Sequence, residues 1–222
     1  MKRLFVFLCA MMLVFTVVGT AGALSIVNGS FEGDGDIGNF LTLGMGNTDI
    51  NGWTITSGTV DWIQDYWTPS DGDRSLDMSG STKGTIAQIV LPTIIDQNYR
   101  VSFDMAGNPD GPPTVKTLQA SVSPPTKVFE FTFDISGKTT TEMGWETMWF
   151  DFTATNTWGY TMLSFGDLTG DSDGDWFGAA LDNVQIVEID SAPVPEPATV
   201  MLVGTGLLGM IAFGRKRFSK KA

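Results

Sequence analysis

Between residues 24 and 193 the chain is a succession of short segments in which apolar and polar residues alternate. The clearest ones carry an apolar side chain at every second position: residues 99–105, 118–122, 129–135 and 148–154. Shorter candidates are residues 25–28, 54–56, 85–91, 161–165 and 182–189. A period of two, with Gly, Pro, Asn and Asp between the segments, is typical of β-strands that bury one face. The pattern predicts about nine strands.

No stretch of this region has the apolar spacing of a helix, and no segment repeats another. Strands with one apolar and one polar face pack as two sheets around a shared core. The sequence therefore predicts one all-β domain over residues 24–190, a jelly-roll β-sandwich of about nine strands.

The first 23 residues have the three parts of a secretory signal peptide. A positive start is followed by an uncharged apolar run at residues 4–18 and by Ala-Gly-Ala at residues 21–23. We expect the mature chain to begin near Leu24, and an uncleaved membrane anchor is the alternative. The one Cys, Cys9, lies in this segment, so the exported domain has no disulfide. A packed core or a bound metal must then stabilise it.

The last residues form a second targeting segment in three parts. A Pro-rich linker (191–197) precedes an apolar stretch (198–214) and a basic end (215–222). The apolar stretch is short for a membrane-spanning helix, and its glycines weaken a helix. The basic end is expected to stay in the cytoplasm by the positive-inside rule. We expect a marginal transmembrane helix that keeps the domain outside the inner membrane; a buried C-terminal helix is the alternative.

The order of these parts resembles the PEP-CTERM sorting signal of Gram-negative bacteria over about residues 194–218. The residues that carry the resemblance are Pro195, Glu196, Pro197, Arg215, Lys216 and Arg217. The resemblance implies recognition by an exosortase, cleavage near the Pro-Glu-Pro motif, and release to the cell surface or into extracellular polysaccharide.

Composition and charge exclude several classes of function. The chain of 222 residues has no His, one Cys and a net charge of -12. It cannot build a His-dependent nucleophile or a zinc site of His or several Cys. Residues 24–193 hold 6 basic and 24 acidic side chains, a net charge of -18. Such a domain repels nucleic acid and favours cations, of which Ca²⁺ is the natural one outside the cell.

An ordered series of motifs spans the domain. It comprises Asn28-Gly29-Ser30-Phe31-Glu32, then residues 58–67, 72–80 and 84–88, then Leu181-Asp182-Asn183-Val184. In this order the motifs resemble the choice-of-anchor C family and its relatives among plant cell-wall proteins. The resemblance implies a galactose-binding-like β-sandwich over nearly all of residues 24–190, a domain that this family pairs with different surface anchors.

The opening and closing motifs are also similar to those of many carbohydrate-binding modules, in which a Glu and an Asp at these places help to hold a structural Ca²⁺. The similarity nominates Glu32 and Asp182 as metal ligands; the alternative is that they pair with basic residues or cap loops. A second acidic run, residues 167–175, resembles the start of a calcium loop. It lacks flanking helices and the final Glu of an EF-hand, so we interpret it as a solvated turn, with calcium as the alternative.

Aromatic residues in predicted loops are the candidates for ligand binding: Trp62, Tyr66, Trp67, Trp145, Trp158 and Trp176. Sugar rings stack on exposed aromatic faces, and neighbouring carboxylates accept hydroxyl hydrogens. We nominate Asp61, Trp62, Tyr66 and Trp67 as a ligand site. The alternative is that each Trp closes one end of the β-sandwich core.

No motif marks a catalytic acid or nucleophile, so we expect no enzymatic activity. The sequence favours an exported, surface-sorted module that binds polysaccharide of the cell envelope or biofilm matrix. The first alternative is a structural matrix protein bridged by Ca²⁺ without a discrete glycan site. A glycan-active enzyme is the less favoured one.

Overall fold

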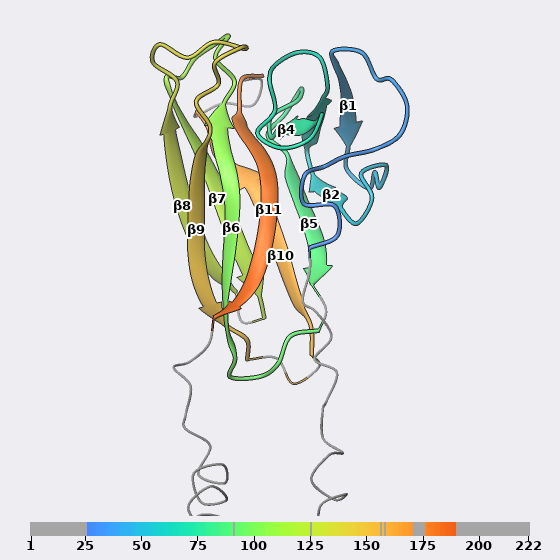
Figure 1. Ribbon diagram of the computed structural model, residues 1–222, viewed down its shortest axis with the longest axis vertical. Helices are drawn as coiled ribbons and strands as arrows, with labels where there is room; N and C mark the ends of the chain where they lie inside the picture. Colours follow the sequence, from blue (N-terminus) through green and yellow to red (C-terminus); the bar gives the residue numbers. More distant parts are fainter. Residues whose placement is uncertain are drawn as a thin grey trace, which may run out of the picture.

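The computed structural model describes residues 26–90, 92–124, 126–155, 157, 159–170 and 176–189, which form two packed antiparallel sheets (Figure 1). The six-stranded sheet has the order β1 (Phe40–Gly44), β3 (Thr59–Ile63), β4 (Ser75–Asp77), β11 (Ala179–Ile189), β6 (Asn98–Gly107) and β9 (Glu146–Thr153). The five-stranded sheet has the order β2 (Thr54–Ser57), β5 (Thr85–Val90), β10 (Thr161–Asp167), β7 (Val115–Ser123) and β8 (Lys127–Asp134). The described residues contain no helix, and the predicted all-β sandwich is confirmed.

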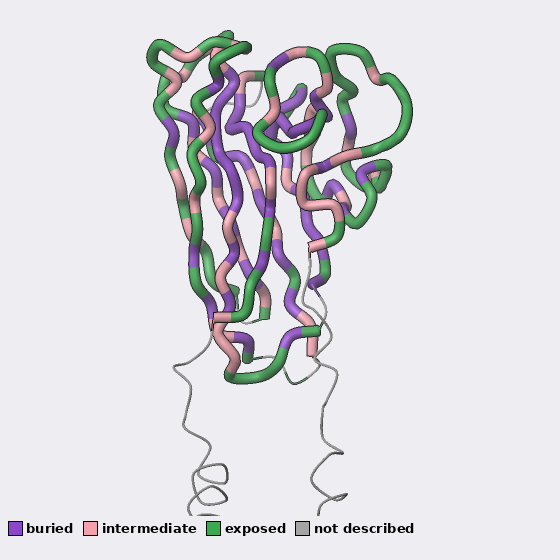
Figure 2. The backbone as a smooth tube through the Cα atoms, in the orientation of Figure 1, coloured by how far each residue is buried: buried purple, intermediate pink, exposed green. Residues whose placement is uncertain are grey.

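The core lies between the sheets and is built from the apolar face of each strand (Figure 2). In β6 the residues at alternating positions, such as Phe103, are buried, while Arg100 and Ser102 between them are half-buried. The Phe103 ring meets Phe131 and Phe165 from the other sheet, with ring centroids 5.1 and 5.0 Å apart. Each such contact removes apolar surface from water, which is the main force that holds the two sheets together.

The strand pattern differs from the prediction at the N-terminal third of the domain. Strands β1, β3 and β4 are additional to the predicted set, and residues 27–30 form a turn where a strand was expected. Asn28 has a left-handed φ of 53°, which strands do not adopt. β4 is three residues long and buried at every position, so it has no exposed face and is too short to show a period of two.

The predicted targeting segments lie outside the described residues: the signal peptide (1–23), the linker (191–197), the sorting helix (198–214) and the basic end (215–222). The same is true of Trp158 and of residues 171–175 of the acidic run. Within the ranges that the structure describes, no helix has the length and apolar character needed to cross a membrane.

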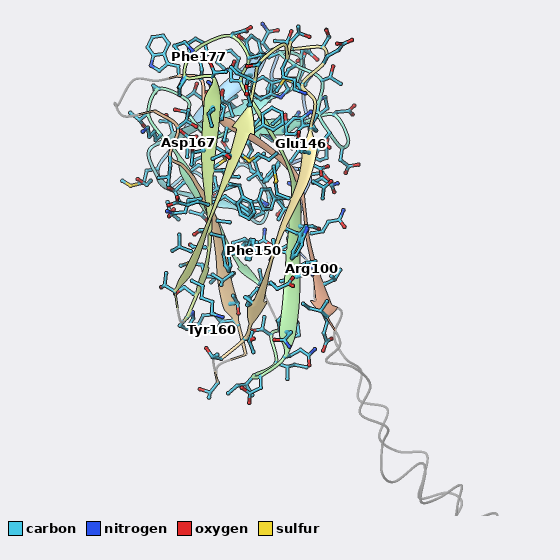
Figure 3. The ribbon with its side chains drawn as sticks, turned by 90° about the vertical axis from the view of Figure 1, so that its left-hand side faces the viewer. Arg100, Glu146, Phe150, Tyr160, Asp167 and Phe177 are labelled. Carbon is cyan, nitrogen blue, oxygen red and sulfur yellow. The ribbon has the colours of Figure 1, made fainter. Side chains whose placement is uncertain are left out.

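The sandwich has two distinct ends (Figure 3). Asp167 at the close of β10 and Phe177 just before β11 lie toward one end, and Tyr160 just before β10 lies at the other. β11 joins the two ends, since it starts at Ala179 beside the first and finishes at Ile189 at the second. The end that carries Phe177 also contains a cavity with aromatic walls.

Candidate functional site

A cavity of about 280 Å³ opens between β1, β3 and β4 on one side and the residues that precede β11 on the other. Aromatic side chains form its walls: Phe40, Tyr66, Trp176 and Phe177. The polar side chains that line it include Asp61, Asp77 and Asn108. This aromatic cavity combines apolar ring surfaces with a few convergent polar groups, which is typical of small-molecule binding sites.

Two carboxyl groups face the cavity from neighbouring strands. Asp61 in β3 lies directly opposite Asp77 in β4. Asp61 is half-buried and accepts a hydrogen bond of 2.5 Å from the Thr42 hydroxyl. Burial raises the pKa of Asp61 above its ordinary value, more than the bond from Thr42 lowers it.

Asp77 is buried, and both of its carboxyl oxygens have partners. Its Oδ2 accepts from the Asn108 amide at 2.8 Å, and its Oδ1 accepts from the backbone N–H groups of Ser79 at 3.0 Å and Gly178 at 3.1 Å. Burial, with a smaller contribution from nearby carboxylates, raises the pKa of Asp77 to about 8. Asp77 is therefore largely protonated at neutral pH, and Asp61 does not face a second full negative charge.

Buried groups hold the backbone of residues 176–178, which forms one wall of the cavity. The Phe177 carbonyl accepts a 2.6 Å hydrogen bond from the ammonium of Lys116, which also donates to the Gly111 carbonyl at 2.8 Å. A Cβ atom at Gly178 would lie 2.7 Å from Asp77 Oδ1, so only glycine fits there. This support fixes the backbone while the adjoining Trp176 side chain stays 61% exposed.

Tyr66 is a fixed part of the opposite wall. Its hydroxyl donates a short hydrogen bond to Asp110, and its ring meets the Phe40 ring edge-on at a centroid distance of 5.7 Å. The bond to Asp110, together with burial and the nearby carboxylates, raises the pKa of Tyr66 to about 12. The phenol therefore stays protonated at any physiological pH.

Of the four predicted ligand residues, the structure brings Asp61 and Tyr66 together in the aromatic cavity, whereas Trp62 and Trp67 are buried and do not line it. Trp62 is 5% exposed, its indole N–H donates to the Phe31 carbonyl at 2.6 Å, and the Arg74 guanidinium covers its ring at 4.2 Å. Trp67 is 4% exposed and donates to the Ser75 hydroxyl at 2.7 Å. Neither indole presents a free face to a sugar.

Further residues of the cavity were not in the predicted site: Phe40, Asp77, Asn108, Trp176 and Phe177. Trp176 had been singled out only as one of several loop aromatics. The others carry no local signal, because they come from β1, β4 and two separate loops that only the fold brings together.

Glu32 and Asp182, the predicted calcium ligands, both hold the loop between β3 and β4. Glu32 Oε1 accepts the N–H groups of Asp73 at 2.9 Å and Arg74 at 3.0 Å. Asp182 Oδ2 accepts those of Ser70 at 2.8 Å and Asp71 at 2.9 Å. Both carboxylates thus act as acceptors for one segment of backbone, which is a loop-fixing role.

The donor set around these carboxylates does not by itself form a metal centre. Within the described ranges, no group of three or more Asp, Glu, His or Cys side chains is arranged to hold a metal ion. The hollow beside Glu32 is also lined by the buried Arg74, which brings a positive charge to the same place. Calcium binding by Glu32 and Asp182 stays a prediction.

Comparisons with known proteins identify two matching family models. A model described as "Protein of unknown function (DUF642)" matches residues 24–187, and one described as the PEP-CTERM protein-sorting motif matches residues 193–217. The choice-of-anchor C assignment is not confirmed by these matches. The sorting motif marks an exported protein that is sorted to the cell surface.

Halomucin from Haloquadratum walsbyi is similar to this chain, with 28% identity over 212 residues. The match covers 91% of this chain and 2% of halomucin, so the chain spans only a small part of the length of that relative.

Several solved structures share the fold. The arabinose-bound MgGH51 α-L-arabinofuranosidase aligns with a TM-score of 0.50 at 13% identity, over 77% of this chain and 27% of that one. The CBM22-1 xylan-binding domain of Paenibacillus barcinonensis Xyn10C aligns with a TM-score of 0.46 at 15% identity, over 72% and 100%. TmCBM61, solved with β-1,4-galactotriose, aligns with a TM-score of 0.41 at 15% identity, over 72% and 92%. At these identities the likeness concerns the two-sheet fold alone.

Proposed function

The chain belongs to the DUF642 family, and we propose that it is a surface-sorted, non-catalytic module that binds polysaccharide in the aromatic cavity. The observation that carries the proposal is the composition of that cavity. Phe40, Tyr66 and Trp176 supply ring surfaces, and Asp61 supplies an acceptor for hydroxyl groups. Stacking and carboxylate hydrogen bonds are the two interactions by which proteins hold sugar rings.

The shape of the cavity supports the binding of a short stretch of a polymer. About 280 Å³ is just below the usual range for small-molecule sites, so it suits one or two sugar units. The cavity is open to solvent beside the exposed Trp176, and the rest of a chain can extend over this aromatic edge.

The arrangement of the two carboxyl groups supports a role without catalysis. Glycosidases need an acid and a nucleophile or base on opposite sides of the scissile bond. Asp61 and Asp77 come from adjacent strands at one side of the cavity, and Asp77 is buried with both oxygens engaged. This arrangement is unlike the two opposed carboxyl groups of a glycosidase.

The C-terminal sorting motif supports delivery to the outside of the cell. In this proposal residues 198–214 hold the chain in the inner membrane until an exosortase-type enzyme cuts near Pro195-Glu196-Pro197. The domain then reaches the cell surface or the extracellular matrix, where envelope or biofilm polysaccharide is its partner. Cell fractionation tests this step: Glu196→Ala should leave the chain in the membrane fraction, and unchanged release would contradict it.

Binding is tested by screening the purified chain against a polysaccharide array. We expect selective binding that Trp176→Ala abolishes and that Trp149→Ala leaves intact. Trp149 is the matched control because it is 54% exposed on β9, at the opposite edge of the same sheet from β1. A folded wild-type chain that binds no polysaccharide would contradict the proposal. Aggregation of that chain by Ca²⁺ alone would favour the structural matrix role, which its charge of -18 over residues 24–193 makes the second candidate.

A further inference from the structure

The aromatic cavity is acidic throughout. Asp61 and Asp77 line it, Asp110 accepts the Tyr66 hydroxyl, and the described lining residues include no Lys or Arg. Residues 24–193 as a whole carry a net charge of -18. An anionic sugar unit would meet the Asp61 carboxylate in a cavity whose described lining offers no cation, which disfavours uronic acids and sulfated units as ligands. The ligand is therefore neutral or cationic.

Asp61 is the carboxylate that remains available to a ligand. Its Oδ1 accepts from Thr42, and its other oxygen has no hydrogen bond to any described residue. In Asp77, by contrast, both oxygens are used by Asn108, Gly178 and Ser79. A half-buried carboxylate with a spare oxygen gains most from a charged donor, because charge-assisted hydrogen bonds are roughly twice as strong as neutral ones.

Gly80 keeps the space beside Asp61 open. A Cβ atom at this position would lie 3.0 Å from Asp61 Oδ1 and 3.2 Å from the methyl carbon of Thr42. Gly80 lines the cavity, so the absence of a side chain there leaves Asp61 approachable. A larger residue would crowd the Asp61 carboxyl group and its hydrogen bond with Thr42.

The ring walls favour the same kind of ligand. Phe40 is 44% exposed and Trp176 is 61% exposed, so both offer ring faces to the cavity. The faces of aromatic rings carry negative charge and attract a cation within about 6 Å of the ring centre. Carboxylate and ring faces together form an environment suited to an ammonium group.

Resting on the proposed glycan-binding function, we propose that the sugar unit bound in this cavity carries a free ammonium group, as in a de-N-acetylated amino-sugar polymer. The ammonium donates to the spare oxygen of Asp61. The sugar ring stacks on Trp176.

The test uses three hexasaccharides with the same β-1,4-linked backbone that differ only at carbon 2. Cellohexaose carries a hydroxyl there, chitohexaose an N-acetyl group, and the glucosamine hexamer a free amine. Isothermal titration calorimetry of the full-length chain in mildly acidic buffer should give a dissociation constant at least about tenfold lower for the amine than for the other two. Asp61→Asn should abolish this preference, and Asp61→Glu should retain part of it.

A matched variant separates the cavity from the acidic surface as a whole. Glu130→Gln removes one charge from an exposed position on β8, in the other sheet, and should leave the amine preference unchanged. If Asp61→Asn does not fold, Gly80→Ala provides the second variant, since its methyl group intrudes beside Asp61 and should weaken amine binding selectively.

The outcomes distinguish the two proposals. Equal affinities for the three hexasaccharides would overturn the ammonium inference and leave glycan binding in place. An amine preference that survives Asp61→Asn, or that Glu130→Gln reduces equally, would also overturn it, because the attraction would then be general. Failure to bind these sugars together with a negative polysaccharide array would remove the proposed function itself.

Discussion

Asp77 and Asp167 accept the backbone N–H groups of two consecutive residues, Gly178 at 3.1 Å and Ala179 at 3.0 Å. Asp77 belongs to the six-stranded sheet and Asp167 to the five-stranded sheet, so the start of β11 is fixed from both layers. Both carboxyl groups are buried, and burial raises the pKa of each. The backbone at this wall of the aromatic cavity is thus held by two acids whose burial favours the neutral form.

This relationship predicts that the domain is more stable in mild acid than at neutral pH. The pKa of Asp77 is raised to about 8 and that of Asp182 to about 7, and burial also raises those of Asp61 and Asp167. Groups with a raised folded-state pKa stabilise the fold fully below their unfolded pKa of about 3.9 and lose this effect as pH rises to the folded value. The thermal midpoint, measured by calorimetry in chelator, should fall by roughly 5 °C or more between about pH 5 and pH 8.

Two substitutions identify the source of this pH dependence. Asp77→Asn should flatten the profile because it removes the group with the highest raised pKa among these acids. Asp151→Asn should not, since Asp151 is exposed and its pKa is lowered by the hydrogen bond from Arg100. A midpoint that rises steadily from pH 5 to pH 8 in the wild-type chain would contradict the assignment.

The tryptophans should divide into two classes of stability effect. Trp62→Ala and Trp67→Ala empty buried sites and should lower the free energy of unfolding by about 3–5 kcal/mol. Trp176→Ala removes an exposed ring and should change it by no more than about 0.5 kcal/mol. Urea unfolding followed by circular dichroism measures all three. A small effect at Trp62 would show that its indole is not held in the core.

The buried Lys116 holds the backbone of the cavity wall, so its removal should reduce both stability and glycan binding. Lys116→Met keeps the apolar stem but leaves the carbonyls of Gly111 and Phe177 without their ammonium donor, which should cost about 2–3 kcal/mol of unfolding free energy. Glycan binding should weaken as well, because residues 176–178 lose an anchor. Lys127→Met, at an exposed position of β8, should change neither property. Equal effects at the two lysines would contradict the role of Lys116.

Calcium is tested through the two carboxylates that hold the loop between β3 and β4. If Ca²⁺ binds the folded chain, millimolar Ca²⁺ should raise the thermal midpoint relative to chelator, by the equivalent of about 2.7 kcal/mol at a hundredfold excess over the dissociation constant. Glu32→Gln and Asp182→Asn should abolish this difference. Both variants should also be less stable in chelator, because each weakens the acceptor of two backbone N–H groups. An identical midpoint with and without Ca²⁺ in the wild-type chain would rule out the predicted ligand role.

The strands that the sequence predicted well are those with one face in the core and one in solvent. β6 and β7 alternate along most of their length, and so do their burial patterns. Two of the strands that it missed lack this contrast: β4 is buried at each position, and the first two residues of β1 are both exposed. The third, β3, alternates over its first four residues but is only five residues long. The alternation of apolar and polar residues reveals a strand only when one face is buried and the other is exposed. A strand whose two faces are alike gives no such pattern.

The candidate site was predicted only in part for a related reason. Asp61 and Tyr66 were nominated because aromatic and acidic residues are neighbours in the chain along β3 and the loop that follows it. Trp67 shares that setting, yet its indole is buried and donates to Ser75 in β4. Whether a loop aromatic faces solvent or the sheet depends on contacts with distant segments. Phe40 and Trp176 meet Asp61 only through such contacts.

The path of β11 sets the distance at which this protein can act from its point of attachment. The strand runs from the cavity end to Ile189, the last described residue before the sorting segment, and its 11 residues span roughly 35 Å at about 3.3 Å each. In the proposed membrane-tethered state, the domain itself would be the spacer that carries the cavity outward. The end of the domain at which β11 finishes lies opposite the cavity. Proteolytic release near that end would therefore not obstruct polymer binding in the cavity.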